Sequence, residues 1–129
     1  NASTRIEILK SAANAFRRLG YHGATVEQIA AALDMQKGNL YYYFRNKEDA
    51  FCQVIESVIV DELAGNVVIP LDDAPRPAIE EGIRAFLGVY DKHTGLWRAL
   101  LEGMLQSPKV QQLWLDLRRD LVARAVPAD

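Results

Sequence analysis

The sequence predicts an all-α fold. Apolar residues recur at three- and four-residue spacing through nearly all of its 129 residues, as they do on the buried face of an amphipathic helix. No long stretch alternates apolar and polar residues, and turn pairs typical of β-hairpins, such as Asn-Gly, are absent. With 50% hydrophobic and 25% charged residues, the composition is that of a globular protein and not of a disordered chain.

The first two helices are predicted from their capping residues. A capping box at Thr4 precedes a helix over residues 5–19, and Gly20 ends that helix. A second capping box at Thr25 precedes a short helix over residues 26–33, whose apolar residues share one face.

A third helix is predicted over residues 37–44, and together with the second it has the proportions of a helix-turn-helix. Such a motif needs a small residue where the helices cross, and Ala30 meets that need. The turn needs a residue that tolerates left-handed backbone, and Asp34 is of such a type. Leu40 and Phe44 lie one turn apart and are expected to anchor the third helix to the core.

Four further helices are expected over residues 47–63, 77–92, 96–105 and 108–125. Asn46 and Ser107 are the expected caps of the first and last of these. The Gly-, Pro- and Asp-rich residues 64–76 form the only plausible boundary. The face expected to be buried on the helix over residues 77–92 consists of Ile79, Ile83, Phe86, Leu87 and Tyr90.

The third helix leaves polar and aromatic residues on its outer side. On a helical wheel Gly38, Asn39 and Tyr42 point away from the direction of Leu40 and Phe44. A glycine allows close approach, an Asn amide pairs with adenine in the major groove, and a tyrosine contacts a thymine methyl or a phosphate. These residue types on one face predict a surface that reads duplex DNA.

The predicted DNA contacts extend to residues that flank this face and to the second helix cap. The full set is Thr25, Lys37, Gly38, Asn39, Tyr41, Tyr42, Tyr43 and Lys47. Core packing is the alternative for the tyrosines, most of all for Tyr41 and Tyr43. Pairing with a carboxylate is the alternative for Lys47.

These residues resemble the DNA-binding module of the tetracycline-repressor (TetR) family. The resemblance rests on residues 25–30 (TVEQIA) and 37–48 (KGNLYYYFRNKE) and covers residues 5–60. Asp34 stands where the family usually has Gly, Gln36 where a Ser or Thr often caps the recognition helix, and Tyr43 where His is common. The implied division is a DNA-binding domain over residues 1–46 and a helical regulatory domain over residues 47–129.

The resemblance implies a dimeric repressor that binds a palindromic operator and is released by a small-molecule inducer. The fourth helix would act as the connector between the domains. The family usually has two further long C-terminal helices that form the dimer, and this sequence ends before them. The inducer, the operator and the regulated genes are not encoded in any residue pattern, nor is the choice between repressor and activator.

A ligand site is expected among the later helices, lined by Phe86, Tyr90, His93, Trp97, Leu100, Met104, Trp114 and Leu117. Ordinary core packing is the alternative for the apolar members, and a hydrogen bond at a helix junction is the alternative for His93. Arg98 is a further candidate for orienting a polar ligand.

Other functional classes find little support. The sequence has no nucleophile elbow and no phosphate-binding loop, so an enzyme is not expected. One cysteine and two scattered histidines predict neither a disulfide nor a metal site, and no cofactor is expected. Cys52 is expected to be a small buried residue. No apolar run is long enough for a membrane span, and a cytoplasmic protein is expected. A helical protein-interaction module without DNA binding remains the alternative function.

The distribution of charge supports the DNA-binding interpretation. The net charge of the chain is −2, but residues 1–50 carry seven basic and five acidic residues, a net charge of +2. Three basic residues and no acidic one lie between Met35 and Lys47. Affinity for DNA depends on this local field and not on the sum over the chain.

Overall fold

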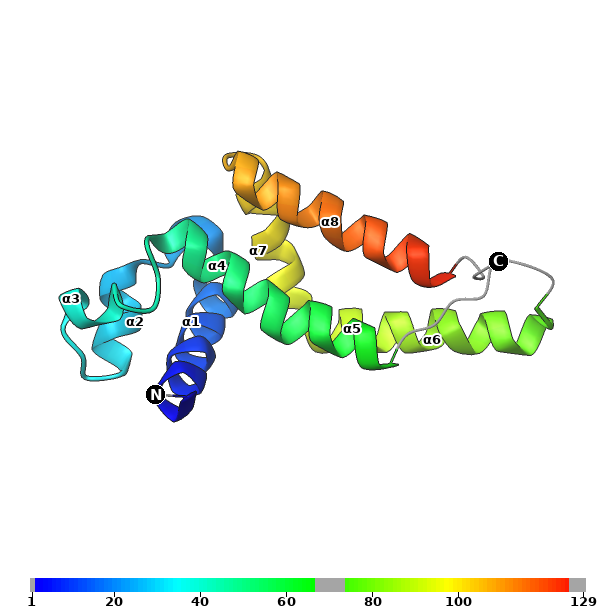
Figure 1. Cartoon of the computed structure of the whole chain (residues 1–129), viewed down its shortest axis with the longest axis horizontal. Coiled ribbons are helices and arrows are strands. Elements are labelled where there is room, and N and C mark those ends of the chain that lie inside the picture. The colour runs from blue at the N-terminus through cyan, green and yellow to red at the C-terminus, as the bar shows by residue number, and fades with distance from the viewer. Residues whose placement is uncertain (1, 67–73, 126–129) are drawn as a thin grey trace.

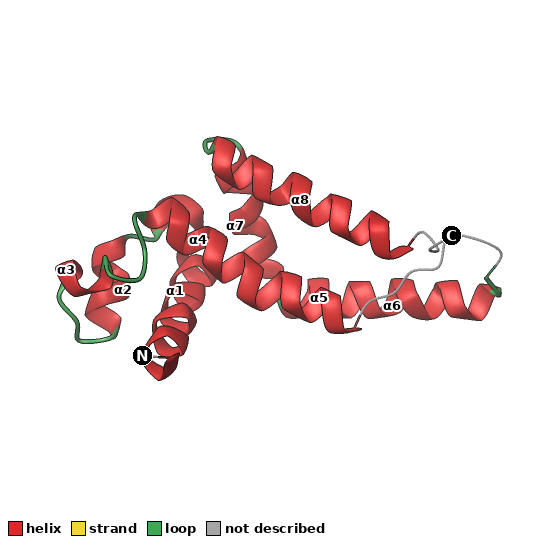
Figure 2. Ribbon diagram, in the orientation of Figure 1, coloured by secondary structure: helices red, strands yellow, loops and turns green. Residues whose placement is uncertain are grey.

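The computed structural model describes residues 2–66 and 74–125, and these residues form helices and no strands (Figures 1 and 2). The elements are α1 (Ala2–Gly23), α2 (Val26–Ala32), α3 (Lys37–Leu40), α4 (Lys47–Ile55), the π-helical segment η1 (Glu56–Val60), α5 (Asp61–Asn66), α6 (Arg76–Lys92), α7 (Thr94–Met104) and α8 (Pro108–Ala125). The all-α prediction is confirmed. Within the described residues no helix is both long and apolar enough to cross a membrane.

The helices are arranged around α4, which runs from the small N-terminal helices toward the opposite end of the molecule (Figure 1). α2 and α3 lie at one end, and α6 extends toward the other. α1 packs against both α4 and α7, and α8 packs against α7 and α4. The helix that opens the chain is therefore in contact with the helices expected to form the regulatory domain.

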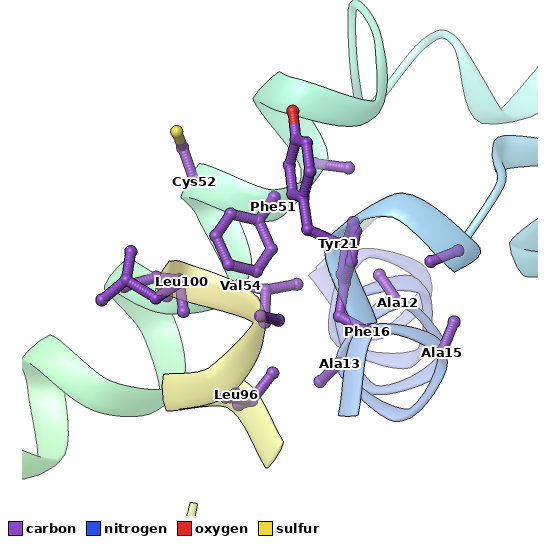
Figure 3. Packing of buried hydrophobic residues seen from close by; sticks show 14 of the residues in the cluster. Ala12, Ala13, Ala15, Phe16, Tyr21, Phe51, Cys52, Val54, Leu96 and Leu100 are labelled. Carbon is purple, nitrogen blue, oxygen red and sulfur yellow. The ribbon is translucent and has the colours of Figure 1, made fainter. Parts of the chain in front are cut away.

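The centre of the core is an aromatic cluster between α1 and α4 (Figure 3). The Phe16 and Phe51 rings meet edge to face with centroids 4.8 Å apart, and Tyr21 packs against Phe51 at 5.1 Å. Leu96 and Leu100 of α7 are fully buried beside them. Edge-to-face packing of this kind adds to the free energy gained by burying the rings.

Two glycines allow the close contact between α1 and α7. Gly20 has φ 78° and ψ 178°, a conformation that side-chain-bearing residues rarely adopt, and it interrupts α1 near its C-terminal end. At Gly95 an added Cβ would lie 2.8 Å from the carbonyl oxygen of Arg17, so α7 approaches the backbone of α1 directly. The prediction that the first helix stops at Gly20 is confirmed by this break.

The predicted caps are partly confirmed. The Thr25 side chain accepts from the backbone N–H of Gln28, Asn46 accepts from Asp49 at 2.8 Å, and Ser107 accepts from Val110 at 3.1 Å. The capping box at Thr4 is wrong, because α1 already begins at Ala2 and places Thr4 inside the helix. Helical backbone that continues N-terminal to a capping residue leaves no free N–H groups for that residue to cap.

Several predicted helices differ from the structure in their ends or in their form. The third helix ends at Leu40 and not at residue 44, the predicted helix over 47–63 contains the π-helical segment, and α7 begins at Thr94. In the π-helical segment each turn takes up more residues than in an α-helix, a deviation that apolar periodicity does not reveal.

The predicted buried face of α6 is wrong for three of its five residues. Ile83, Leu87 and Tyr90 are each more than 40% exposed, and the buried positions of α6 are Gly82 and Val89. α6 packs mainly against α5 and α7 among the described elements, so much of its apolar stripe faces outward. An amphipathic pattern predicts that a face is apolar, but it does not identify a partner for that face.

Cys52 is buried, as expected, and burial raises the pKa of its thiol to about 11. At about pH 8 only about a thousandth of the thiol is then the reactive thiolate. We expect the native protein to react with Ellman's reagent far more slowly than the unfolded protein, and the rates of thiol modification with and without denaturant measure this. Equal rates would contradict the burial of Cys52.

Candidate functional site

The helix-turn-helix has the geometry that the sequence predicts. Ala30 is 3% exposed where α2 meets α3, and Asp34 has the only positive φ of any non-glycine residue in the described chain, 54°. The backbone N–H of Met35 donates to the Ala30 carbonyl at 2.9 Å and closes the turn. Leu40 and Phe44 are buried, so both predicted anchors are confirmed.

The recognition segment, residues 37–44, contains a shorter α-helix than predicted, because its last turn tightens. The N–H groups of Tyr42 and Tyr43 donate to carbonyls three residues back, those of Asn39 and Leu40. Gln36 precedes α3 without a side-chain cap bond. A four-residue helix followed by a tight turn still directs its side chains by helical geometry, so the outward face survives the correction.

The outward residues of this segment are exposed to solvent. Tyr42 is 88% exposed, Asn39 is exposed, and a Cβ added at Gly38 would meet nothing within 4 Å. Tyr41 is 44% exposed, whereas Tyr43 is half-buried, so the alternative of core packing applies in part to Tyr43. A ring as exposed as that of Tyr42 is available for contact with a partner.

Lys37 is held at the start of this surface by an acidic neighbour. Its ammonium lies 2.5 Å from Oε1 of Glu27 in α2 and 5.9 Å from the centre of the Tyr41 ring. The hydrogen bond between the two groups raises the pKa of Lys37 and lowers the pKa of Glu27. Both side chains are largely exposed, so the pair is weak and can exchange partners.

Lys47 is held by main-chain carbonyls and not by the carboxylate that was the alternative. Its Nζ donates to the Tyr21 carbonyl at 2.8 Å and to the His22 carbonyl at 3.4 Å, and lies 4.7 Å from the centre of the Tyr21 ring. Burial lowers the pKa of this ammonium. Lys47 therefore ties the start of α4 to the end of α1, and a phosphate contact from its remaining N–H stays a prediction.

A cavity of about 570 Å³ lies among α6, α7 and α8. Six of the eight predicted ligand residues line it: Phe86, Tyr90, Trp97, Leu100, Met104 and Trp114. The Trp97 ring is at the centre of the aromatic group, 5.8 Å from Tyr90 and 6.4 Å from both Phe86 and Trp114. The structure thus brings together residues that the sequence spreads over 29 positions.

His93 and Leu117 do not line this cavity. The His93 Nε2 lies 2.6 Å from a carboxylate oxygen of Glu62, and the ring is buried where α6 meets α7. This hydrogen bond, with Lys92 as a second partner, lowers the pKa of Glu62. Leu117 is 3% exposed and belongs to the core. The hydrogen-bonded alternative for His93 is therefore confirmed: its imidazole joins α5 to the α6–α7 junction and lies outside the lining of this cavity.

Sequence reasoning missed two groups of residues. Thr94 and Leu101 line the cavity, and their helical spacing from Tyr90 and Trp97 was the available signal. The other group links the α7–α8 corner to the N-terminal helices. Oε1 of Glu102 accepts from the backbone N–H of Tyr21 at 2.7 Å, Ser107 donates to Glu48, and Lys109 pairs with Asp49 at 3.4 Å. Local sequence patterns do not predict contacts between residues that are 59 to 81 positions apart.

Known proteins resemble this chain in sequence and in fold. Residues 8–52 match the model of the bacterial regulatory proteins of the tetR family. The chain is 39% identical over 82 residues to the transcriptional regulator RutR of Escherichia coli K12, in a match that covers 64% of this chain and 39% of RutR. It is 32% identical over 91 residues to the transcriptional repressor NicS of Pseudomonas putida, covering 70% of this chain and 43% of NicS.

The chain belongs to the TetR family. Its fold matches that of the flavonoid-responsive regulator FrrA, with a TM-score of 0.76 and 20% sequence identity over 96% of this chain and 65% of FrrA. The match to the TetR-family model includes the whole recognition segment and the start of α4. The matched part of the chain spans less than half of the length of RutR and of NicS.

Proposed function

We propose that this TetR-family chain is the DNA-binding and ligand-sensing part of a transcriptional repressor that acts in the bacterial cytoplasm. The observation that carries the proposal is that the recognition segment has one buried side and one exposed side. Leu40 and Phe44 fix it to the core, while Gly38, Asn39 and Tyr42 are presented to solvent on its other side. A surface of this composition suits the major groove, where an amide pairs with adenine and a bare backbone permits close approach.

The proposed operator is palindromic and is bound by a homodimer. Two recognition segments then enter successive major grooves roughly 34–36 Å apart, one turn of B-DNA. The reading face consists of Gly38, Asn39 and Tyr42. The residues around it are assigned to phosphate contacts: Thr25, Lys37, Tyr41, Tyr43 and Lys47. These contacts fix the register of the protein on the duplex, whereas Asn39 and Tyr42 select the sequence.

The proposed inducer occupies the cavity among α6, α7 and α8. α7 supports this assignment because it carries cavity residues on one side, such as Trp97, and Glu102 on the side that contacts α1. Glu102 bonds the backbone of Tyr21, and the carbonyl of Tyr21 in turn accepts from Lys47. A ligand that shifts α7 therefore acts on the junction that orients the recognition segment, and an effector coupled in this way changes DNA affinity.

Binding to duplex DNA as a function of salt tests the proposal. DNA fragments selected from a random duplex pool, with the chain fused to a dimer-forming coiled coil, give the operator to be used. A regulator loses affinity steeply as salt rises, because phosphate contacts release counterions. A helical protein-interaction module, the competing function, shows neither selected sequences nor salt-dependent duplex binding.

Replacement of Glu27 by Gln is expected to strengthen DNA binding by about three- to tenfold at low salt. The substitution removes a negative charge beside the reading face and releases Lys37 from its ion pair. Fluorescence anisotropy with the selected operator measures the change. Glu80→Gln, which removes an equally ordinary surface carboxylate from α6, is the control and leaves the affinity unchanged. Equal affinities of wild type and Glu27→Gln would show that Lys37 does not contact DNA.

A further inference from the structure

The cavity among α6, α7 and α8 has a composition that restricts its ligand. Its described lining is mostly apolar and aromatic, with Trp97 between the rings of Phe86, Tyr90 and Trp114. Rings in these orientations, two tilted and one edge-on to Trp97, offer both faces and edges to a guest. A volume of about 570 Å³ accommodates an aromatic compound with a side chain.

A single charged side chain is found among the described residues that line this cavity. Arg98 is exposed, and none of the hydrogen bonds or ion pairs seen in the described residues involves its guanidinium. Glu62 binds His93 and Lys92, and Glu102 binds the Tyr21 backbone, so neither carboxylate pairs with Arg98 in this structure. The one charge carried by the described lining residues is therefore the positive charge of Arg98.

The positive charge of Arg98 distinguishes between cationic and anionic ligands for this aromatic cavity. Aromatic rings attract cations, and a cage of rings alone would suit an ammonium group. A cation in this cavity would face Arg98 with no Asp or Glu among the described lining residues to balance it. A planar guanidinium instead binds a carboxylate through two parallel hydrogen bonds.

A second polar group beside the cavity is also without a partner. The indole Nε1 of Trp97 is buried and makes no hydrogen bond within the described structure, although a buried N–H donor is normally satisfied. Its ring is 9% exposed and lines the cavity. An indole N–H only donates, so a ligand that shifts the Trp97 ring on entry would satisfy this group with an acceptor and not with a donor.

We infer that the cavity binds an aromatic carboxylate, with the ring among Phe86, Trp97 and Trp114 and the carboxylate at Arg98. The inference rests on the proposed function, in which this cavity holds the effector, and it adds the chemical class of that effector. The apolar contacts supply affinity and the guanidinium supplies the preference for an acid over its neutral or cationic analogue.

The two tryptophans of the chain serve as a fluorescent probe of this cavity. Trp97 and Trp114 are its only two tryptophans, and both line the cavity. Intrinsic tryptophan fluorescence therefore reports occupancy of this site with no added label. Excitation at the red edge of indole absorption, where a phenyl ring does not absorb, avoids interference from the test compounds.

Three compounds of the same shape test the preference: 3-phenylpropanoate, 3-phenylpropanamide and 3-phenylpropylamine, which are anionic, neutral and cationic at neutral pH. We expect the acid to change the tryptophan emission and to bind about tenfold more tightly than the amide, with the amine weakest. Arg98→Gln abolishes the preference for the acid. Arg84→Gln, which removes an exposed arginine of α6 outside the cavity, keeps it.

Four experimental results would contradict the inferred ligand class. Tightest binding of the amine, equal binding of acid and amide, a preference that survives Arg98→Gln, or no binding of any of the three up to their solubility limits would each overturn the inference. Operator binding, measured separately by anisotropy, distinguishes a failure of the inferred ligand class from a failure of the proposed function. An acid that binds at Arg98 but leaves DNA affinity unchanged upholds the ligand class and contradicts the ligand-responsive part of the proposed function.

Discussion

Replacement of Tyr42 by Ala is expected to weaken operator binding by about 30- to 100-fold, the loss typical of a central aromatic contact. Tyr42 is 88% exposed on a surface whose neighbours Gly38 and Asn39 offer little apolar area of their own. Its ring lies outside the buried core, so we expect its removal to cost the folded state little. The loss therefore falls on the complex and not on the free protein.

Anisotropy titration with the selected operator measures this effect, and circular dichroism checks that the helical content is unchanged. Leu105→Ala is the matched control, because Leu105 is an 84% exposed apolar residue at the end of α7, far along the chain from the recognition segment. Wild-type affinity in the Tyr42→Ala protein would overturn the assignment of the recognition surface. A comparable loss in the Leu105→Ala protein would show that the effect is not local.

Replacement of Gly20 by Ala is expected to lower the free energy of unfolding by about 3 kcal/mol and Tm by roughly 10 °C. Two costs add. A Cβ is strained at φ 78° and ψ 178°, and it would lie 2.4 Å from Oε1 of Glu102. The Glu102 carboxylate can move away, but it then gives up its hydrogen bond to the backbone N–H of Tyr21.

Thermal and urea unfolding measure the effect of Gly20→Ala. Gly88→Ala is its control: Gly88 lies within α6, a Cβ there meets nothing within 4 Å, and we expect a gain of about 0.5–1 kcal/mol. Gly20→Ala in a Glu102→Ala background separates the two costs, because only the backbone strain remains. A Gly20→Ala protein as stable as the wild type would show that the left-handed conformation is not required.

The helix-turn-helix was predictable in detail from the sequence. The small residue at Ala30, the turn residue at Asp34 and the anchors Leu40 and Phe44 each meet a local requirement, and the structure places all four as expected. The ends of helices were less predictable. The tight turn after Leu40 and the π-helical segment depend on where α4 must go to pack, which periodicity does not encode.

The partners of charged and polar side chains were the least predictable feature. Lys47 was assigned to phosphate, with a carboxylate as the alternative, and it contacts the carbonyls of Tyr21 and His22. His93 was grouped with the ligand residues and bonds Glu62. In each pair the residues are 25 to 31 positions apart, and a flexible charged side chain takes whichever partner the packing of helices brings within reach.

The sequence by itself determined which segments are helical, where the helix-turn-helix lies and which of its residues face away from the core. These properties follow from spacing within a few residues, where helix geometry leaves little choice. Only the tertiary structure decided that α7 runs against α1 at Gly95, that Glu102 bonds the Tyr21 backbone, and that aromatic residues of three helices surround one cavity beside Arg98. Those contacts depend on how separate helices pack in three dimensions, and helical periodicity states which face packs but not against what.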